Sequence, residues 1–358
     1  MKNIASTYSF FSSVGKYRLR TILYIAIFWT IIDIIVTFFL NDAKTASPFK
    51  SILLREVAVF IMSSIMGYLF VFTLRNLFRN KSAVVNFIIK TVILLFAAFA
   101  MNFLIHFIDT VFVFGKTPQH AIQLFFEDNL QSKRLVKKIL YWLVLFVTTQ
   151  LYIEINEKYS PGVFIDIILG KYMQPKVEKR IIMFIDLKDS TPIAEKLGHI
   201  ENFKFIRNFI FHVSMAIIEN DGRIYQYVGD EIVISWLYEK KNTKKCMASI
   251  IEARKNIQKN GQYFRRNFGM IPDFRVGIHL GEVTVGEIGV IKKDLAMSGD
   301  TMNTTARIRS ACNELNHKYI MSKDFVDGSD IKEWQGESLG IIDLKGKSEG
   351  IELFSLNI

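Results

Sequence analysis

The chain has 358 residues, enough for about two domains. Hydrophobic residues make up 50% of it, charged residues only 22%, and the mean hydropathy is +0.24. This balance is too apolar for a disordered chain or an ordinary soluble enzyme, and it predicts a membrane part. The two cysteines, Cys246 and Cys312, are too few for a disulfide-based fold, so we expect reduced thiols.

The net charge of +11 is unevenly distributed along the chain. Residues 1–155 hold 16 Lys and Arg against 7 Asp and Glu, whereas residues 156–358 hold 29 against 27. The excess cations therefore flank the apolar half, where they can face lipid headgroups. The other half lacks the basic stripe that nucleic-acid binding requires, which argues against nucleic acid as a partner.

Four apolar stretches approach or exceed the roughly 20 helical residues that cross a bilayer. They cover residues 21–40, 57–74, 83–108 and 139–155. We expect residues 1–20 to form a cytoplasmic N-terminal segment and residues 21–155 a domain of four transmembrane helices. The first stretch is too long for a signal peptide, and no small-residue cleavage site follows it. The positive-inside count barely favours either orientation.

Two ionisable residues fall inside the predicted spans, where charge is costly to bury. Lys90 is close enough to the cytoplasmic end for its ammonium group to reach the interface, which favours a structural role. Asp33 lies deeper and has no evident partner, so a sensing role and a packing role both stay open. The loops at residues 43–55 and 109–138 are expected on the outer side.

After residue 155 the chain changes character. Residues 156–179 contain Pro161-Gly162, Gly170 and Pro175 and are expected to form a coupling linker. Beyond it, short β-type runs alternate with longer helical ones. Strands are expected at residues 180–187, 223–228, 231–238 and 274–288, the last with a turn at Gly281-Glu282. Helices are expected at residues 192–220, with a break near Gly198, and at residues 241–268.

The order β-α-β-β-α-β is that of ferredoxin-like α+β folds. In that fold the third strand lies antiparallel beside the first, so the end of the first strand adjoins the start of the third. Asp186 and Asp230 occupy these two places and should face the same small volume. Paired carboxylates with open positions suit hard divalent cations such as Mg²⁺. A helix-capping Asp186 and a turn-forming Asp230 are the structural alternative.

The residues after Asp186 predict the start of a helix near this site. Ser190 or Thr191 can cap the helix, and Pro192 suits its first turn. The free backbone N–H groups of the first turn would then point toward the two aspartates. Together with Asp189, these residues form a candidate phosphate-binding segment.

Five motifs follow one another over about 180 residues. They are residues 184–191 (FIDLKDST), 227–231 (YVGDE), 276–281 (VGIHLG), 298–307 (SGDTMNTTAR) and 344–347 (LKGK). Together they resemble the class III adenylate and guanylate cyclases. Residues 170–175 (GKYMQP) and 194–198 (AEKLG) are similar to a membrane-bound bacterial subgroup. The resemblance implies a cyclase catalytic domain at residues 180–358.

The resemblance also implies a reaction and a cofactor. A nucleoside triphosphate would be converted to its 3′,5′-cyclic monophosphate and pyrophosphate by a head-to-tail homodimer with two sites at the interface. Two Mg²⁺ or Mn²⁺ ions per site would be bound by Asp186, Ile185 and Asp230. Because this chemistry uses cytosolic nucleotide, the resemblance implies a multi-pass protein of the cell (inner) membrane with its catalytic domain in the cytoplasm.

Three further residues match the family's catalytic positions. Asn303 and Arg307 match the pair that positions the ribose and stabilises the pentavalent phosphorus from the other subunit. They lie four residues apart and so share one face of a helix. Lys345 matches a lysine that holds the triphosphate. A guanidinium at position 307 suits the charge that develops on the phosphorus oxygens.

The positions that choose the base match neither substrate class. Family members that use ATP usually carry lysine at the place of Gln226 and aspartate or threonine at that of Ala296. Guanylate cyclases usually carry glutamate and cysteine. Gln226 can donate and accept hydrogen bonds and so could bind adenine or guanine, whereas Ala296 can do neither. ATP is favoured because it is abundant and most bacterial members use it.

Four alternatives remain open from the residues. They are a guanylate or other nucleotide cyclase, a membrane receptor whose cyclase-like domain binds nucleotide without turnover, a diguanylate cyclase, and a four-span transporter. A diguanylate cyclase should carry a Gly-Gly-(Asp/Glu)-Glu-Phe turn, but residues 228–232 have the sequence VGDEI. A transporter would leave the five motifs unexplained. No motif identifies a membrane or extracytoplasmic ligand.

Overall fold

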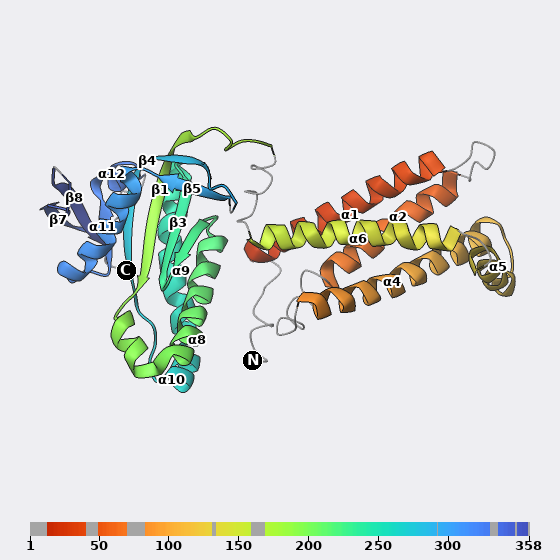
Figure 1. The fold of residues 1–358 in the computed structure, drawn as a ribbon, viewed down its shortest axis with the longest axis horizontal. Coiled ribbons are helices and arrows are strands. Elements are labelled where there is room, and N and C mark those ends of the chain that lie inside the picture. The colour runs from red at the N-terminus through yellow and green to blue at the C-terminus, as the bar shows by residue number, and fades with distance from the viewer. Residues whose placement is uncertain are drawn as a thin grey trace. The chain divides into compact units, whose positions relative to one another are not determined.

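The computed structural model describes residues 13–40, 49–69, 83–130, 134–158, 169–291, 293–329, 336–347 and 349–356. The chain divides into two compact units, Met1–Ile155 and Asn156–Ile358, and each is described by itself. The first unit is helical and the second is α+β (Figure 1).

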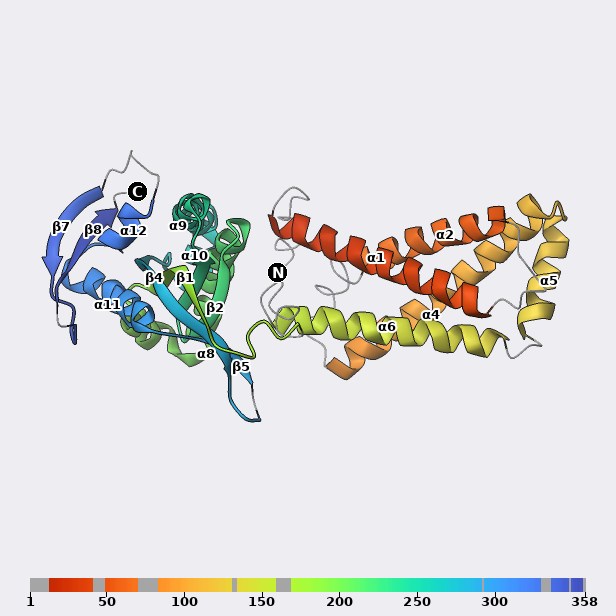
Figure 2. The same cartoon turned by 90° about the horizontal axis from the view of Figure 1, so that it is seen from above.

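The described residues of the first unit contain four long helices. They are α1 (Ser13–Leu40), α2 (Phe49–Tyr68), α4 (Ala83–Ile108) and α6 (Arg134–Lys158). The helix α4 continues into a π-helical turn, η2 (Asp109–Val113), and the short helix α5 (Pro118–Leu130) follows. The long helices run side by side, with α5 at one end (Figures 1 and 2). Trp29, Val59, Leu94 and Trp142, one from each long helix, share a buried core.

The expected spans all fall on helices, with differences at their ends. Residues 13–20, expected in a separate segment, already belong to α1, and α2 begins well before residue 57. The helix α5 was not expected, because its residues are too polar and too few for a span. Residues 70–74 of the second expected span and residues 159–168 of the expected linker lie outside the described residues.

The helical unit is apolar on its surface and partly polar inside. Large apolar side chains are exposed on every long helix, among them Phe38, Phe49, Phe96 and Leu140. The buried residues include Asp33, Ser63, Lys90, Thr149 and Gln150. By length and composition, Arg18–Val36 and Phe87–Val113 could each cross a membrane, and Leu140–Ile153 is a shorter apolar helix. Two of the four expected spans therefore meet this test within the described residues.

Asp33 is fully buried and has partners that the sequence did not reveal. Arg55 donates from Nε to Oδ2 at 2.9 Å and from Nη2 to Oδ1 at 3.1 Å. Tyr141 of α6 donates to Oδ1 at 3.2 Å. Arg55 was expected in an outer loop but lies on α2, because this helix starts before the apolar run does. These contacts join α1, α2 and α6 and give Asp33 a packing role.

Lys90 is structural, but not in the way expected. Its ammonium group is buried and donates to Gln150 Oε1 of α6 at 3.1 Å. The side chain therefore bonds within the helical unit instead of reaching an interface.

Replacing Arg55 by Gln should destabilise the helical unit, because the carboxylate of Asp33 stays buried without its cation and beside the buried Glu56. We expect a loss of about 1–3 kcal/mol, less than for a fully buried pair because the Arg55 side chain is 37% exposed. Unfolding of the full chain in detergent measures this loss. The exposed Arg20→Gln is the control for charge alone. Adding Asp33→Asn to Arg55→Gln should recover stability; an unchanged midpoint in Arg55→Gln would contradict this role.

The second unit is built on one eight-stranded sheet in the order β2-β3-β1-β4-β6-β8-β7, with β5 paired to β4. Its strands are β1 (Lys176–Leu187), β2 (Arg223–Val228), β3 (Glu231–Leu237), β4 (Phe274–Ile288), β5 (Asp294–Ser298), β6 (Tyr319–Ser322), β7 (Gly336–Ile342) and β8 (Ile351–Leu356). Its helices are α8 (Ser190–Glu219), α9 (Lys240–Lys259), α10 (Gly261–Phe268), α11 (Asp300–Glu314) and α12 (Lys323–Asp327). The expected β-α-β-β-α-β core is present.

Two expectations about this unit are wrong. No turn occurs at Gly281-Glu282, because β4 is one strand of 15 residues. Gly281 is needed there for close packing instead: a Cβ would lie within 2.4 Å of Thr301 Oγ1, so a larger residue could not fit without displacing Thr301. The helix expected at residues 241–268 is two helices. Asn260 ends α9, and its side-chain amide donates to the Asn256 carbonyl at 2.8 Å.

Successive side chains of β1 point to opposite faces of the sheet. Ile181, Met183 and Ile185 are buried in the core beneath α8, α9 and α10, which cover one face of the sheet (Figure 1). Ile182 and Phe184 are buried on the opposite face, where Met302 and Ala306 of α11 pack. Asp186 continues the second series and therefore lies on the face that α11 covers.

Candidate active site

Two aspartates meet where β1 ends and β3 begins. These strands are antiparallel, with Ile185 opposite Ile232, so Asp186 lies close to the tight turn that precedes β3. Gly229 supplies the left-handed conformation of that turn, with φ of 64°, and Asp230 follows it. The carboxylates of Asp186 and Asp230 are near enough to interact. The predicted juxtaposition is therefore present.

An arginine that the sequence analysis missed contacts Asp186 and the neighbouring Glu231. Arg309 of α11 donates from Nη1 to Asp186 Oδ2 at 3.2 Å and lies 2.7 Å, through Nη2, from Glu231 Oε2. Glu231 directly follows Asp230 in the motif, and Arg309 lies two residues after Arg307. Arg275 is opposite Asp186 in the β1–β4 register, which brings a further cation to the same sheet face.

Burial dominates the electrostatics of this carboxylate cluster. It raises the pKa of Asp186 from 3.8 to about 6, because the charged form loses hydration; Arg309 opposes the rise, and Asp230 and Glu231 add to it. Burial likewise raises the pKa of Glu231, again against the effect of Arg309. Asp186, Asp230 and Glu231 thus share this edge of the sheet with two cations, Arg309 in contact with Asp186 and Glu231, and Arg275 opposite Asp186.

The helix that follows Asp186 begins differently from what the sequence suggested. Asp189 is the N-cap, with φ of 58° and no capping hydrogen bond from its side chain. Ser190 and Thr191 lie in the first turn of α8 and are not caps. The left-handed Asp189 starts the helix earlier than Pro192 indicated, and the N–H groups of the first turn still begin just after the end of β1.

A second group of polar residues lies on and near α11. Asn303 is exposed and Arg307 is half-buried, one helical turn apart. The guanidinium of Arg307 lies over the turn at Gly346, where an added Cβ would be 3.1 Å from Nη2. Lys345 is exposed in the same turn, and Lys347 pairs with Asp300 at the start of α11. Among the contacts of the described residues, Arg309 reaches Asp186, whereas Arg307 reaches neither aspartate.

The two candidate base-selecting residues lie on β2 and β5, which are not adjacent in the sheet. Gln226 is exposed on β2, and Ala296 lies on β5, which extends with β4 as a long ribbon beyond the rest of the sheet (Figure 2). The hydroxyl of Tyr225 accepts a hydrogen bond from the Met297 N–H at 3.0 Å. Residues adjacent to Gln226 and Ala296 are therefore in direct contact.

Residues 172–357 match the family model described as adenylate and guanylate cyclase catalytic domain. The chain belongs to this family. The match agrees with the resemblance carried by the five motifs, and it decides against the diguanylate cyclase and transporter alternatives for this half of the chain. It starts just before β1 and covers every strand of the sheet.

Curated relatives of this cyclase-family chain include bacterial enzymes. It is 29% identical over 206 residues to adenylate cyclase 2 of Rhizobium meliloti (strain 1021), which covers 57% of each chain. It is 26% identical over 215 residues to an adenylate cyclase of Anabaena cylindrica, covering 56% of this chain and 42% of the relative. The chain thus spans about half the length of these relatives. A bacterial light-regulated adenylyl cyclase has a similar fold, with a TM-score of 0.53 over 61% of this chain and 64% of that one at 18% identity.

The carboxylate pair of the cyclase domain has the character of a metal site. Oδ2 of Asp230 is buried and accepts no hydrogen bond from the described residues. No group of three His, Cys, Asp or Glu side chains forms a ready cage in the described ranges. Two carboxylates with open positions fit Mg²⁺, which keeps waters and takes substrate phosphates as further ligands. The Ile185 side chain is in the core, so only its main-chain carbonyl could contribute.

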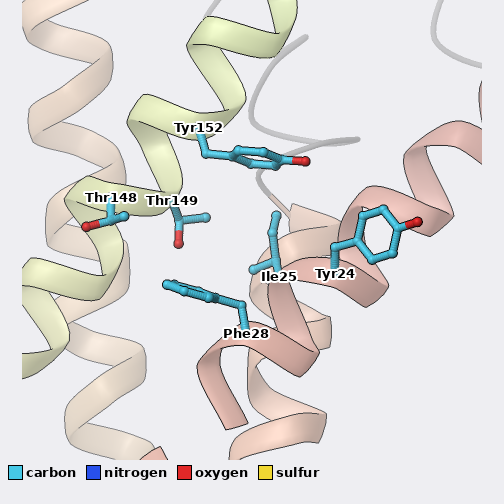
Figure 3. A pocket seen from close by; sticks show the side chains of 6 residues that line it. All are labelled: Tyr24, Ile25, Phe28, Thr148, Thr149 and Tyr152. Atoms are coloured by element: carbon cyan, nitrogen blue, oxygen red, sulfur yellow. The ribbon is translucent and has the colours of Figure 1, made fainter. Parts of the chain in front are cut away.

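A cavity in the helical unit has a different chemistry from the cyclase site. It has a volume of about 360 Å³ and lies between α1 and α6 (Figure 3). Its lining residues are Tyr24, Ile25, Phe28, Thr148, Thr149 and Tyr152. The two threonine hydroxyls donate to the helix carbonyls of Val144 and Leu145. The walls are therefore apolar and uncharged, which suits an apolar molecule and not a nucleoside triphosphate.

The raised pKa of Asp186 predicts how the stability of the metal-free protein depends on pH. The stabilising contribution of protonated Asp186 to the free energy of unfolding is fully present below pH 4. It is lost as the pH rises through about 6, because the folded state disfavours the charged carboxylate. Asp186→Asn should remove this dependence and stabilise the chelated protein at pH 7.5 by about 1–2 kcal/mol. Denaturant unfolding with a chelator, at several pH values, measures the difference. The exposed Asp343→Asn is the control; destabilisation by Asp186→Asn at pH 7.5 would contradict the expectation.

Proposed function

We propose that the protein is a membrane-bound adenylate cyclase that converts ATP to 3′,5′-cyclic AMP and pyrophosphate at sites shared by two subunits. The observation that carries this proposal is the separation of two residue groups within one chain. Asp186 and Asp230 lie at the end of β1 and start of β3, whereas Arg307 lies over the turn that contains Lys345. The aspartates can bind metal ions, whereas Arg307 and Lys345 can bind phosphate oxygens, and cyclisation requires both functions.

The chemistry assigns a role to each group. Asp186 and Asp230, with the Ile185 carbonyl, would bind two Mg²⁺ or Mn²⁺ ions. When bound, these cations would lower the pKa of the ribose 3′-hydroxyl and neutralise charge on the departing pyrophosphate. The 3′-hydroxyl gives its proton to water, and its oxygen bonds to the α-phosphorus as the bond from that phosphorus to pyrophosphate breaks.

The second group acts on the same nucleotide from the partner subunit. Arg307 balances the charge that grows on the phosphorus oxygens, and Asn303 positions the ribose. Lys345, from the same subunit as Arg307, binds the triphosphate together with the first turn of α8, from Asp189 through Thr191, which belongs to the subunit that supplies the aspartates. In a head-to-tail dimer, the carboxylates of each chain meet the α11 helix of the other, which gives two sites at the interface.

The helical unit supports a membrane location. Its apolar side chains are exposed and several polar ones are buried, an arrangement that is unfavourable in water and suits a lipid environment. Two of its stretches are long enough to span a bilayer. We place four helices in the cell (inner) membrane and the cyclase domain in the cytoplasm, where ATP is found. A sensory role for the helical unit, with an unidentified ligand, belongs to this proposal.

The test of the function is product analysis. Full-length protein in detergent is given ATP, GTP, CTP or UTP with Mg²⁺ or Mn²⁺, and cyclic nucleotide and pyrophosphate are measured. Equal amounts of cyclic AMP and pyrophosphate support the proposal. Cyclic GMP as the main product would make the protein a guanylate cyclase. Nucleotide binding without any cyclic product would support the receptor alternative.

Mixed dimers test whether the site is shared. Asp186→Ala and Arg307→Ala should each nearly abolish activity alone. In a mixed dimer both faults fall in one site and the other site is intact, so random mixing should restore about one quarter of wild-type activity. Co-expressed, affinity-purified pairs measure this recovery.

The matched control is Asp186→Ala co-expressed with Asp230→Ala. These faults lie in the same half of the site, so every site of the mixed dimer remains defective. Recovery in this control, or no recovery in demonstrated Asp186→Ala/Arg307→Ala dimers, would contradict the head-to-tail arrangement.

Base choice should be modest, because Gln226 lacks a fixed charge and Ala296 cannot form a side-chain hydrogen bond. We expect ATP to be preferred over GTP by about 10–100-fold, as one or two hydrogen bonds provide. Gln226→Glu with Ala296→Cys should shift the ratio toward GTP. The ratio of kcat/KM values measures the shift, and an unchanged ratio would show that other residues select the base.

A further inference from the structure

The helix α11 carries two arginines that point to different places. Residues two apart on an α-helix differ by about 200° in direction, so Arg307 and Arg309 lie on nearly opposite faces. Arg307 lies over the turn at Gly346, and Arg309 contacts Asp186 and Glu231. One helix thus carries an arginine for the proposed site shared with the partner subunit and another that pairs with carboxylates of its own chain.

The position of Arg309 is fixed by packing of the main chain. A Cβ on Gly277 of β4 would lie 2.4 Å from the backbone nitrogen of Arg309, so the helix rests directly on the strand at this point. Near the start of α11, Thr301 donates to the Glu282 carbonyl of β4 at 2.6 Å. These two contacts hold α11 at a set distance from the sheet and bring Arg309 within reach of Asp186.

Arg309 occupies an oxygen of Asp186 that a metal ion would need as a ligand. Arg309 Nη1 hydrogen-bonds Asp186 Oδ2 in a half-buried setting, where the side chains are 23% and 19% exposed. A divalent cation bound by Asp186 would lie beside this guanidinium and repel it. The Nε of Arg309 is buried and has no acceptor among the described residues, so the arginine regains hydration when it leaves.

We propose that Arg309 is an internal counter-cation of the carboxylate cluster, which neutralises Asp186 and Glu231 in the metal-free protein and must release Asp186 before a divalent cation binds. Arg309 therefore sets the metal concentration at which the site fills. The inference rests on the proposed function in one respect, that Asp186 and Asp230 bind the metal. It concerns this residue alone and does not require that the protein turn over nucleotide.

The experiment measures binding of Mn²⁺ to the full chain in detergent by calorimetry, without nucleotide and at fixed pH and salt. Arg309→Gln should bind Mn²⁺ about 3- to 30-fold more tightly than wild type, as expected for loss of a half-buried competing cation. Lys323→Gln, which removes a cation paired with Glu352, should leave the affinity unchanged. Arg309→Lys keeps the charge and should remain within about twofold of wild type.

Weaker or unchanged Mn²⁺ binding by Arg309→Gln would overturn the inference; the weaker result would mean that Arg309 positions Asp186 for the metal. If Arg309→Gln fails to fold, Arg309→Met, which keeps a long unbranched side chain, gives the same comparison. Asp186→Asn separates this inference from the proposed function. If Asp186→Asn leaves Mn²⁺ affinity unchanged, the metal assignment fails; if it weakens binding while Arg309→Gln does not strengthen it, only the role of Arg309 fails.

Discussion

The antiparallel pairing of β1 with both β3 and β4 is the constraint on which the cyclase domain depends. It places β1 in the middle of the sheet, with apolar residues buried on both faces up to Ile185. Asp186 is the point at which this series becomes polar, and the pairing to β3 brings it to the turn that contains Asp230. Two carboxylates can therefore be close together although a long helix separates them in sequence.

Short sequence patterns predicted the features that depend only on residues adjacent in the sequence. The apolar run that ends at Asp186, the hairpin at Gly229-Asp230 and the break at Gly198 all have direct signals in the sequence, and the structure has each of them. The antiparallel position of β3 beside β1 followed from the element order. These are the features that place the aspartates.

The contacts that were missed depend on how two elements pack. Arg309 reaches Asp186 because α11 rests on Gly277, and no local pattern states the rotation of a helix on a strand. Arg55 reaches Asp33 for a similar reason: helix α2 extends beyond its apolar run, so a charged residue that resembled a loop residue lies inside the packed unit. Both arginines pair with a carboxylate from another element.

The contact between α11 and Gly277 has a mechanical consequence for a dimer of the proposed kind. The backbone of this 15-residue helix lies against the strand, so a displacement of the helix would move its residues together. A small rotation about its own axis would carry Arg307 and Arg309 in opposite directions. These residues would belong to different sites of the dimer. The rotation, about the contact with Gly277, would therefore move one side chain in each of the two sites at the same time.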